Sequence, residues 1–279
     1  MNLSEIKIVT DSSSDMLCLE RANFSAAPLK IITAQQEFVD DAALDVADMV
    51  TTLAGYHGRS STACPGPGDW LNAFADAKYV FCVTITSNLS GSYNAACAAR
   101  DQYLQDHPDR QVYILDSLSV GPEMQLILIH FRNAIADGAS FEEACAAADA
   151  YRQNTGLLFM LSSMRNLANN GRVKPIVAKA AGILSIRAIG KASDQGTLEM
   201  LDKSRGEKKA LQTMYSRMTQ LGYHGGRVRI GHCDNEAAAM ALRALICADY
   251  PAAKIDYYPC RGLCSFYAEA GGLLLGFEK

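Results

Sequence analysis

The sequence contains no long apolar run, and this absence argues against a membrane-spanning segment. A transmembrane helix needs ~20 consecutive apolar residues. The densest runs here are 124–131, which is too short, and 175–186, which carries Lys179. The first residues, MNLSEIKIVTD, lack the apolar core of a signal peptide and lead directly into a predicted strand. We therefore expect a cytoplasmic protein.

Excess positive charge is also lacking. The chain has 26 Lys and Arg residues against 30 Asp and Glu residues, which gives a formal net charge of −4. Proteins that bind nucleic acid usually present a basic surface to the phosphates. We therefore expect no nucleic-acid partner.

The common motifs for catalysis and for metal binding are missing. The chain has no GxxxxGK phosphate loop and no G-x-S-x-G nucleophile elbow, and none of its five histidines lies in a catalytic pattern. Cys260 and Cys264 are separated by three residues, and no second cysteine pair has zinc-finger spacing, although His232 and Cys233 lie nearby. We expect no catalytic residue, no metal and no cofactor.

What the sequence does contain is the composition of a soluble globular protein with a sizeable core, since 49% of its residues are hydrophobic and 20% are charged. A length of 279 residues suits about two domains. Strand and helix signals alternate over residues 1–157, which predicts a parallel sheet with helices on both faces. Residues 158–279 mix strands and helices without strict alternation, which is typical of an α+β domain. No Pro-, Gly- or Ser-rich linker separates the halves, so we expect two closely packed domains with a ligand in the cleft between them.

Hydrophobic periodicity locates the individual elements. Ser140 and Glu143 have the spacing of a capping box at the start of one helix. The residues Pro65 to Gly68 disfavour regular structure, and Asp69 is the expected start of another helix. Helices are predicted at 40–55, 90–107, 122–138, 140–156, 204–222 and 235–250, and strands at 7–11, 79–86, 111–116, 227–232, 254–260 and 271–279, with further strand-like pieces in 174–203.

Asp, Ser and Thr follow three of the strands in the first half, as Asp11-Ser12, Thr86-Ser87 and Asp116-Ser117. Parallel strands bring their carboxyl ends to one edge of the sheet, where ligands gather in open α/β folds. One interpretation is that these residues only cap turns. The other is a small-molecule acyl or phosphoryl transfer enzyme that uses Asp11 or Asp116 as a base or metal ligand.

Two loops are unusually rich in hydroxyl groups. In SSTACPGPGDW, Ser61 and Thr62 precede a rigid turn, and in TITSNLSGSYNAA, Ser90 is predicted to be the N-cap of a helix, followed by Gly91. Free backbone N–H groups and the helix dipole favour an anion at such a helix start. Because the second loop carries no lysine, a carboxylate fits it better than a triphosphate. The simpler alternatives are that the first loop is a plain surface loop and that the second only caps its helix.

Two arginines are candidates for holding an acidic ligand or partner. Arg172 lies in a glycine turn, NNGRVKP, and Arg205 directly precedes Gly206. The guanidinium group suits carboxylates because it can donate two parallel hydrogen bonds.

Taken together, these segments resemble the DegV family of bacterial lipid-binding proteins. They span most of the chain in the order expected for that family. The matching segments are IVTDSSSDM, SSTACPGPGDW, ITSNLSGSYNAA, VYILDSLSVG, LSSMRNLANNGRV, GILSI and KSRGEKKAL.

The resemblance implies a non-enzymatic protein that encloses one long-chain fatty acid between its two domains. The acyl tail would lie in an apolar tunnel, and Thr62 and Ser90, with Ser61 and Gly91 beside them, would bind the carboxylate. Some family members are the binding subunit of bacterial fatty acid kinase and present the carboxyl group to a separate ATP-using subunit. In those proteins, arginines that match Arg172 and Arg205 lie near the head group or the partner-facing surface.

The C-terminal region departs from the family pattern. Many members carry a His-x-Gly-Pro-Gly loop close to the head group, whereas this chain reads CRGLCSFYAEAGG, with Tyr267, Ala268 and Glu269 near the expected histidine position. Two hypotheses follow: Arg261 replaces the missing positive charge, and Glu269 alters the accepted head group. The leading interpretation remains a fatty-acid carrier, and a partner-binding module is a third alternative.

Overall fold

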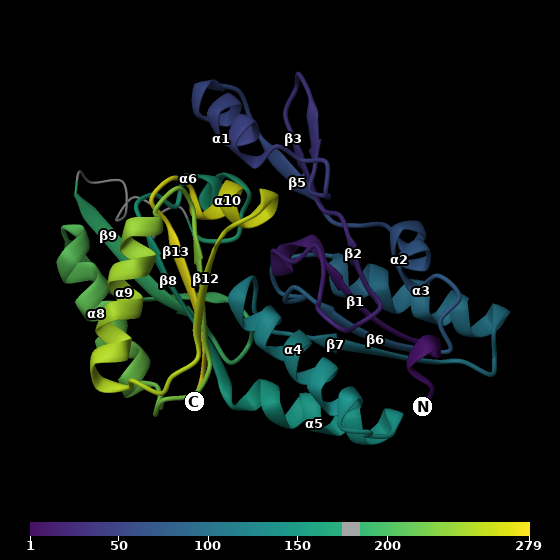
Figure 1. Ribbon diagram of the computed structural model, residues 1–279. Helices are drawn as coiled ribbons and strands as arrows, with labels where there is room; N and C mark the ends of the chain where they lie inside the picture. Colours follow the sequence, from purple (N-terminus) through teal and green to yellow (C-terminus); the bar gives the residue numbers. More distant parts are fainter. Residues whose placement is uncertain (175–184) are drawn as a thin grey trace.

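The computed structural model describes residues 1–174 and 185–279, and its chain forms two large sheets and one small one (Figure 1). The first sheet is entirely parallel and has the strand order β2-β1-β6-β7. Its strands are β1 (Ile6–Asp11), β2 (Phe24–Ala27), β6 (Tyr79–Thr84) and β7 (Gln111–Asp116), which confirms the three strands predicted in this region at 7–11, 79–86 and 111–116.

Helices cover both faces of this first sheet, as the alternation of strand and helix signals predicts. α2 (Pro67–Phe74) and α3 (Ser92–Asp106) pack on one face, and α4 (Pro122–Ala136) and α5 (Phe141–Gln153) pack on the other. Each face of the sheet packs in its own hydrophobic core, and successive residues of β6 point into different cores. Phe81 lies in the core under α4 and α5, and Cys82 lies in the core under α2 and α3. A strand buried on both faces reads as a continuous apolar run, which is why β6 is recognisable in the sequence.

The second sheet is mixed and has the order β10-β9-β8-β13-β11-β12. Only the pair β11–β12 is parallel. α8 (Glu207–Gln220) and α9 (Glu236–Asp249) cover one face of it through a separate core. The strands are β8 (Thr155–Leu161), β9 (Ile186–Ala192), β10 (Leu198–Arg205), β11 (Val228–His232), β12 (Ile255–Pro259) and β13 (Leu273–Glu278).

We call the first sheet with its helices the first lobe and the second sheet with its helices the second lobe. The first turn of α4 packs against the other face of the second sheet and so joins the two lobes. Gly276 of β13 makes this approach possible, because an added Cβ would lie 2.6 Å from the backbone nitrogen of Glu123. The expected division after residue 157 falls inside β8, which belongs wholly to the second sheet. We therefore propose that the two domains divide at the turn between α5 and β8.

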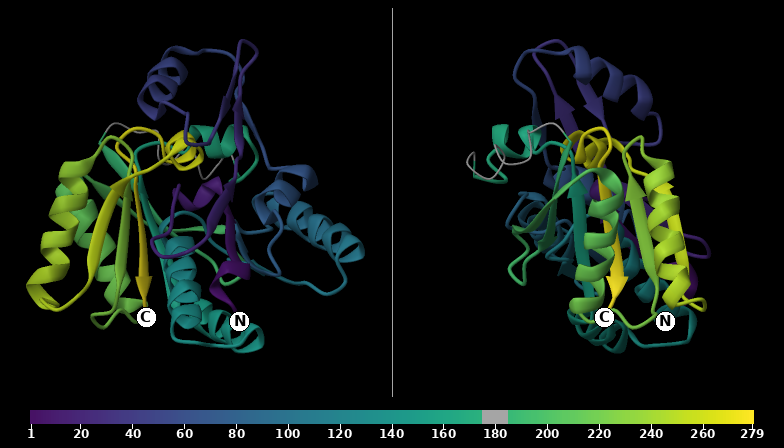
Figure 2. Two further views of the ribbon diagram at one scale, coloured as in Figure 1. Left: turned by 45° about the vertical axis from the view of Figure 1, so that its right-hand side comes forward. Right: turned by 90° about the vertical axis from the view of Figure 1, so that its left-hand side faces the viewer.

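A small antiparallel sheet, order β4-β3-β5, is absent from the sequence-based prediction. It consists of β3 (Lys30–Ile32), β4 (Glu37–Val39) and β5 (Ser61–Ala63), and with α1 (Val46–Gly55) it lies above the two larger sheets (Figure 2, dark blue). Strands of three residues are too short to produce a periodic pattern.

Four predicted helix starts are wrong. α8 begins at Glu207 instead of residue 204, because Ser204 and Arg205 still belong to β10, and α3 begins at Ser92 instead of residue 90. α1 begins at Val46 instead of residue 40, because Asp45 is its N-cap and accepts the N–H of Asp48 at 3.0 Å. α2 begins at Pro67, two residues before the predicted start, because proline is favoured at the first helical position, where its missing N–H is not needed.

The other predicted elements in the described residues are present. The helices are α3, α4, α5, α8 and α9, and the strands in the second half are β11, β12 and β13. The capping box of α5 is confirmed, since the Ser140 hydroxyl accepts the Glu143 N–H at 3.2 Å and the Glu143 carboxylate accepts the Ser140 N–H at 2.8 Å. The strand-like signal within 175–184, and with it most of the GILSI segment, lies outside the described residues. Across residues 1–174 and 185–279, we find no helix with both the length and the apolar character needed to cross a bilayer.

Candidate functional site

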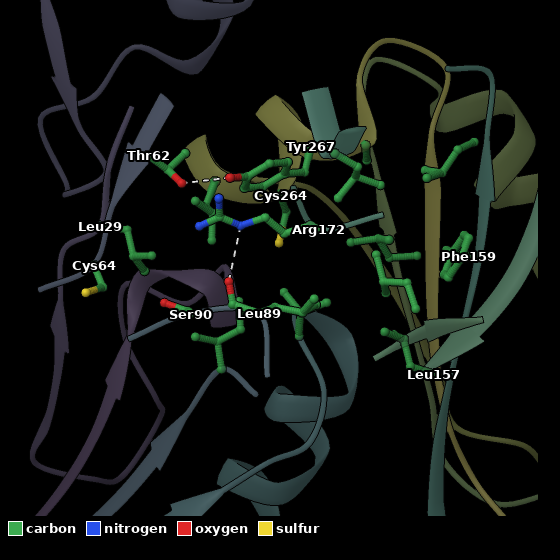
Figure 3. Close-up of a pocket in the computed structure, with 18 of the residues that line it drawn as sticks. Leu29, Thr62, Cys64, Leu89, Ser90, Leu157, Phe159, Arg172, Cys264 and Tyr267 are labelled. Atoms are coloured by element: carbon green, nitrogen blue, oxygen red, sulfur yellow. Dashed lines mark hydrogen bonds between the residues drawn. The ribbon is translucent and has the colours of Figure 1, made fainter. Parts of the chain in front are cut away.

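A cavity of about 310 Å³ lies between the first and second lobes (Figure 3). Its volume is within the ~300–1,000 Å³ range of small-molecule sites. Most of its lining is apolar and comes from both lobes, with a few polar groups from loops and from α10 (Gly262–Ala268). The apolar lining residues are Leu29, Ala63, Ile85, Leu89, Val120, Leu157, Phe159, Leu161, Leu167, Leu198, Leu263, Ala268 and Leu274.

The second lobe contributes one face of β8 to this cavity. Leu157, Phe159 and Leu161 all line the cavity, because alternate residues of a strand point to the same side. The residue paired with Phe159 across β9 is Gly190, which leaves room for the aromatic ring; a Cβ there would lie 2.2 Å from a ring carbon. The intervening residues of β8 belong to the core under α8 and α9.

The polar groups of the cavity gather at one end, on the left of Figure 3. The hydroxyls of Thr62 on β5 and Tyr267 on α10 form a hydrogen bond of 2.7 Å. The guanidinium of Arg172 lies 5.8 Å from the centre of the Tyr267 ring. Burial raises the pKa of Tyr267, so its hydroxyl stays protonated and can donate a hydrogen bond at neutral pH.

Arg172 is held in place by backbone carbonyls. Its Nε donates to the carbonyl oxygen of Leu89 at 3.2 Å, and its Nη1 donates to that of Asn170. Within the described residues, no carboxylate forms an ion pair with Arg172, and its Nη2 donates to no acceptor. The polar end of the cavity therefore presents a positive charge with hydrogen-bonding capacity to spare.

Ser90 and Gly91 lie beside this polar end, at the start of α3. The N-cap is Gly91 and not Ser90, but the Ser90 hydroxyl still accepts the N–H of Ser92, at 3.3 Å. The two hydroxyl-rich loops approach each other here. A Cβ added to Gly91 would lie 3.1 Å from the Sγ of Cys64 on the other loop. Cys64 is itself an exposed thiol in the cavity lining.

Asp11 holds the loop between β6 and α3 in this position. Its fully buried carboxylate accepts the N–H of Ile85 at 2.9 Å, the hydroxyl of Ser92 at 2.6 Å, and both the N–H and the hydroxyl of Ser13. Burial raises its pKa, and the hydrogen bonds oppose that rise. Asp11 therefore joins the end of β1 to the loop between β6 and α3, which is more than 70 residues away in the sequence.

Asp116 has a similar but smaller role at the same edge of the sheet. Its carboxylate accepts the N–H groups of Ser87 and Leu118 at distances of 3.1–3.3 Å. The prediction that the Asp- and Ser-rich strand ends share one edge is confirmed. The carboxylate oxygens of Asp11 and Asp116 accept hydrogen bonds from backbone N–H groups and, at Asp11, from hydroxyls. These contacts agree with the interpretation that both residues cap turns.

Four of the six predicted ligand-binding residues line the cavity, namely Thr62, Ser90, Gly91 and Arg172. Ser61 and Arg205 do not. Ser61 precedes Thr62 on β5, so its side chain points to the opposite face of that strand. Arg205 is exposed at the end of β10.

The two hypotheses about the C-terminal region do not agree with the structure. Arg261 lies outside the cavity lining; its guanidinium donates to the carbonyl of Asp41 and lies 3.8 Å from the carboxylate of Asp40. Glu269 also lies outside the lining, and its carboxylate accepts the N–H of Asn166 at the start of α6 (Arg165–Asn169) at 3.1 Å.

The polar cavity residue to which the sequence assigned no role is Tyr267. The sequence placed it near the position of the family histidine but assigned it no role. No local pattern marks it, since its position depends on contact between α10 and β5, 205 residues apart. Among the described residues, no group of three or more His, Cys, Asp or Glu side chains is arranged to hold a metal ion.

The fold and the cavity define the class: a two-lobed α/β binding protein with an apolar cavity that is polar at one end. The chain belongs to the DegV family, since a model of that family, described as "Uncharacterised protein, DegV family", matches residues 5–278. It is 45% identical over 276 residues to a DegV domain-containing protein of Streptococcus pneumoniae and 40% identical over 277 residues to one of Streptococcus gordonii, with 98% of each chain covered.

Solved structures that resemble this chain contain bound fatty acids. A DegV family protein from Eubacterium eligens loaded with heptadecanoic acid has a TM-score of 0.97 and 45% identity. The Streptococcus pneumoniae Fatty Acid Kinase (Fak) B3 protein loaded with linoleic acid has a TM-score of 0.96 and 44% identity. Each comparison covers 98% of this chain and 99% of the other.

Proposed function

We propose that the protein is a cytoplasmic carrier of one long-chain fatty acid and has no catalytic activity of its own. The acyl tail lies in the apolar cavity, and the carboxylate lies at the end formed by Thr62, Tyr267, Ser90, Gly91 and Arg172. The observation that carries the proposal is this cavity, apolar along its length and polar at one end. Two solved structures that are 44–45% identical to this chain contain a bound fatty acid, and this similarity also supports the proposal.

The physical chemistry of a fatty acid matches both ends of the cavity. Burial of the tail is favourable by ~0.8 kcal/mol for each CH₂ group. A carboxylate taken out of water needs charge-assisted hydrogen bonds. Such donors are supplied by the hydroxyl pair of Thr62 and Tyr267 and by the Nη2 group of Arg172, which donates to no acceptor within residues 1–174 and 185–279.

Mass spectrometry of the purified protein tests the proposal directly. We expect organic extraction to release a long-chain acyl species, and we expect palmitate or oleate to raise the Tm of the delipidated protein. Ligand that binds only the native state stabilises it in proportion to RT ln(1 + [L]/Kd), which makes the shift concentration-dependent. Release of no acyl species, together with no thermal shift, would overturn the proposal.

Arg172→Gln is expected to weaken fatty-acid binding by about 10- to 100-fold. Hydrogen bonds to charged groups contribute ~1.5–3 kcal/mol, and glutamine removes the charge while keeping a polar side chain. Titration of the delipidated protein with oleate measures the change in Kd. Arg205→Gln is the matched control: the same substitution at an exposed position outside the cavity should leave Kd unchanged. Equal effects of the two substitutions would exclude Arg172 as a head-group ligand.

We further propose that the bound carboxylate is presented to a separate ATP-dependent fatty acid kinase subunit. The similarity to the Fak B3 protein supports this part of the proposal, as does the exposure of Gly91 and Cys64 beside the polar end. The test is formation of acyl phosphate when the oleate-loaded protein is mixed with ATP and a fatty acid kinase catalytic subunit. Binding of oleate without acyl phosphate formation would leave the carrier function and remove the kinase coupling.

A further inference from the structure

A second pocket, of about 300 Å³, lies next to the apolar cavity and has the opposite character. Charged side chains line it, among them Glu123 on α4, Arg152 on α5 and Lys279 at the C-terminal end, and β8 and the loops after β7 and β9 add hydroxyl groups. Among the described residues, Leu157 is the one that lines both spaces. The apolar cavity and the polar pocket therefore meet at this one side chain.

Leu157 lies across the cavity from Thr62 and Ser90. Figure 3 shows Leu157 low on the right, whereas Thr62 and Ser90 are on the left. The cavity-facing row of β8 begins at Leu157 and ends at Leu161, which spans about 13 Å at ~3.3 Å for each residue. Leu161, at the other end of the row, belongs to the cluster that packs against Tyr267, whereas Leu157 does not, so a ligand that extends along the row from the Tyr267 side meets Leu157 last.

Leu157 has a residue without a side chain as its neighbour on the adjacent strand. Its partner across β13 is Gly276, against which the backbone of Pro122 and Glu123 packs. Leu157 is only 2% exposed, so its side chain fills the space between that backbone and the cavity.

The polar pocket does not suit the methyl end of an acyl chain. The buried carboxylate of Glu123 accepts the hydroxyl of Thr155 at 2.7 Å, and the buried Nε of Arg152 has no hydrogen-bond partner among the described residues. An apolar chain that entered this space would separate these groups from water or from one another, which is costly.

We propose that Leu157 closes the apolar cavity and sets the longest acyl chain that the protein accepts. This inference rests on the proposed function and identifies the residue that determines its length specificity. Chains that reach Leu157 gain apolar contact with each added carbon, and chains that would pass it meet the charged pocket.

The test measures the Kd of saturated fatty acids from 12 to 22 carbons for the delipidated wild-type protein and for three variants, with intact folding confirmed by thermal unfolding. Leu157→Ala removes three carbons from the wall, so the length limit should increase by about two carbons. The first acid beyond the wild-type limit should bind about tenfold more tightly, as two further buried CH₂ groups predict. Leu157→Phe should shift the limit toward shorter acids.

Leu161→Ala is the matched control, because Leu161 lies on the same face of the same strand and lines only the apolar cavity. It should weaken binding of all acids by a similar factor and leave the length limit where it is. An unchanged limit in both Leu157 variants, or an equal shift in Leu161→Ala, would overturn the inference while leaving fatty-acid binding intact. If the wild-type protein binds none of these acids, the proposed function itself fails.

Discussion

Asp11→Ala is expected to lower the free energy of unfolding by about 3–5 kcal/mol, as is typical when one partner of a buried charged network is removed. The substitution leaves the N–H of Ile85 and the hydroxyl of Ser92 without an acceptor at a site that water does not reach. It also releases Ser13, which donates through both its N–H and its hydroxyl. Unfolding in urea, followed by circular dichroism, measures the loss.

Asp116→Ala is the control for this prediction, because Asp116 caps a neighbouring strand end but is only half-buried. Its two backbone donors can turn to water, so we expect a loss of at most about 1–2 kcal/mol. Equal losses in the two variants would show that burial at Asp11 is not the source of the effect.

Substitution of Asp11 also distinguishes the proposed carrier from the alternative, an acyl or phosphoryl transfer enzyme. Because Asp11 fixes the loop that carries Ser90, its removal should weaken fatty-acid binding together with stability. A transfer enzyme with Asp11 as its base predicts something different: turnover of simple esters or phosphoesters that Asp11→Asn abolishes while the fold stays intact. That outcome would replace the carrier proposal.

Asp15→Asn is expected to stabilise the protein at pH 8 relative to the wild type, by up to about 4 kcal/mol, and to lose this advantage near pH 4. Burial is the main cause that raises the pKa of Asp15 from 3.8 to about 7, and the nearby carboxylate of Asp40 contributes. One oxygen accepts the N–H of Arg261 at 2.8 Å, whereas the other is buried without a partner in the described residues. Asparagine keeps the acceptor and cannot ionise.

The direction of the pH dependence follows from proton binding. The native state binds the Asp15 proton more tightly than the unfolded state, so protonation stabilises the fold. This contribution is complete below about pH 4 and is lost as the pH rises to about 7. Wild-type stability should therefore fall across this range more steeply than that of Asp15→Asn. If the free energy of unfolding, measured in urea at pH 4, 6 and 8, changes equally with pH in the two proteins, the prediction is contradicted. The contributions of buried carboxylates that do not interact with Asp15 cancel in the comparison.

The elements that the sequence predicts well are those with strong periodicity or unbroken burial. β6 is apolar on both faces, and the helix α4 that follows β7 is buried along its first two turns, from Pro122 to Ile129, so each is evident without tertiary information. The start of α1 was predicted too early because Asp40 looks like part of the helix. Its carboxylate instead accepts the N–H groups of Gly262 and Leu263, at 2.9 Å each, more than 200 residues away.

The polar end of the site was partly recognisable for a local reason. Hydroxyl groups before a rigid turn or a helix start are unusual enough to single out Thr62 and Ser90. Such patterns do not tell which of two adjacent residues faces inward, so Ser61 was included although β5 turns it away. Arg205 was included for its charge, although it is exposed at the end of β10.

The sequence by itself determined the α/β class, the order of most elements and the two hydroxyl-bearing loops, because these depend on residues close together in the chain. Only the tertiary structure decided that Tyr267 joins Thr62, that Arg172 lies over the Tyr267 ring, and that Leu157 separates an apolar cavity from a polar pocket. Each of these relations depends on segments that are far apart in the sequence. Periodicity and capping report on the nearest few residues of the chain, whereas a cavity is formed by side chains that only packing brings together.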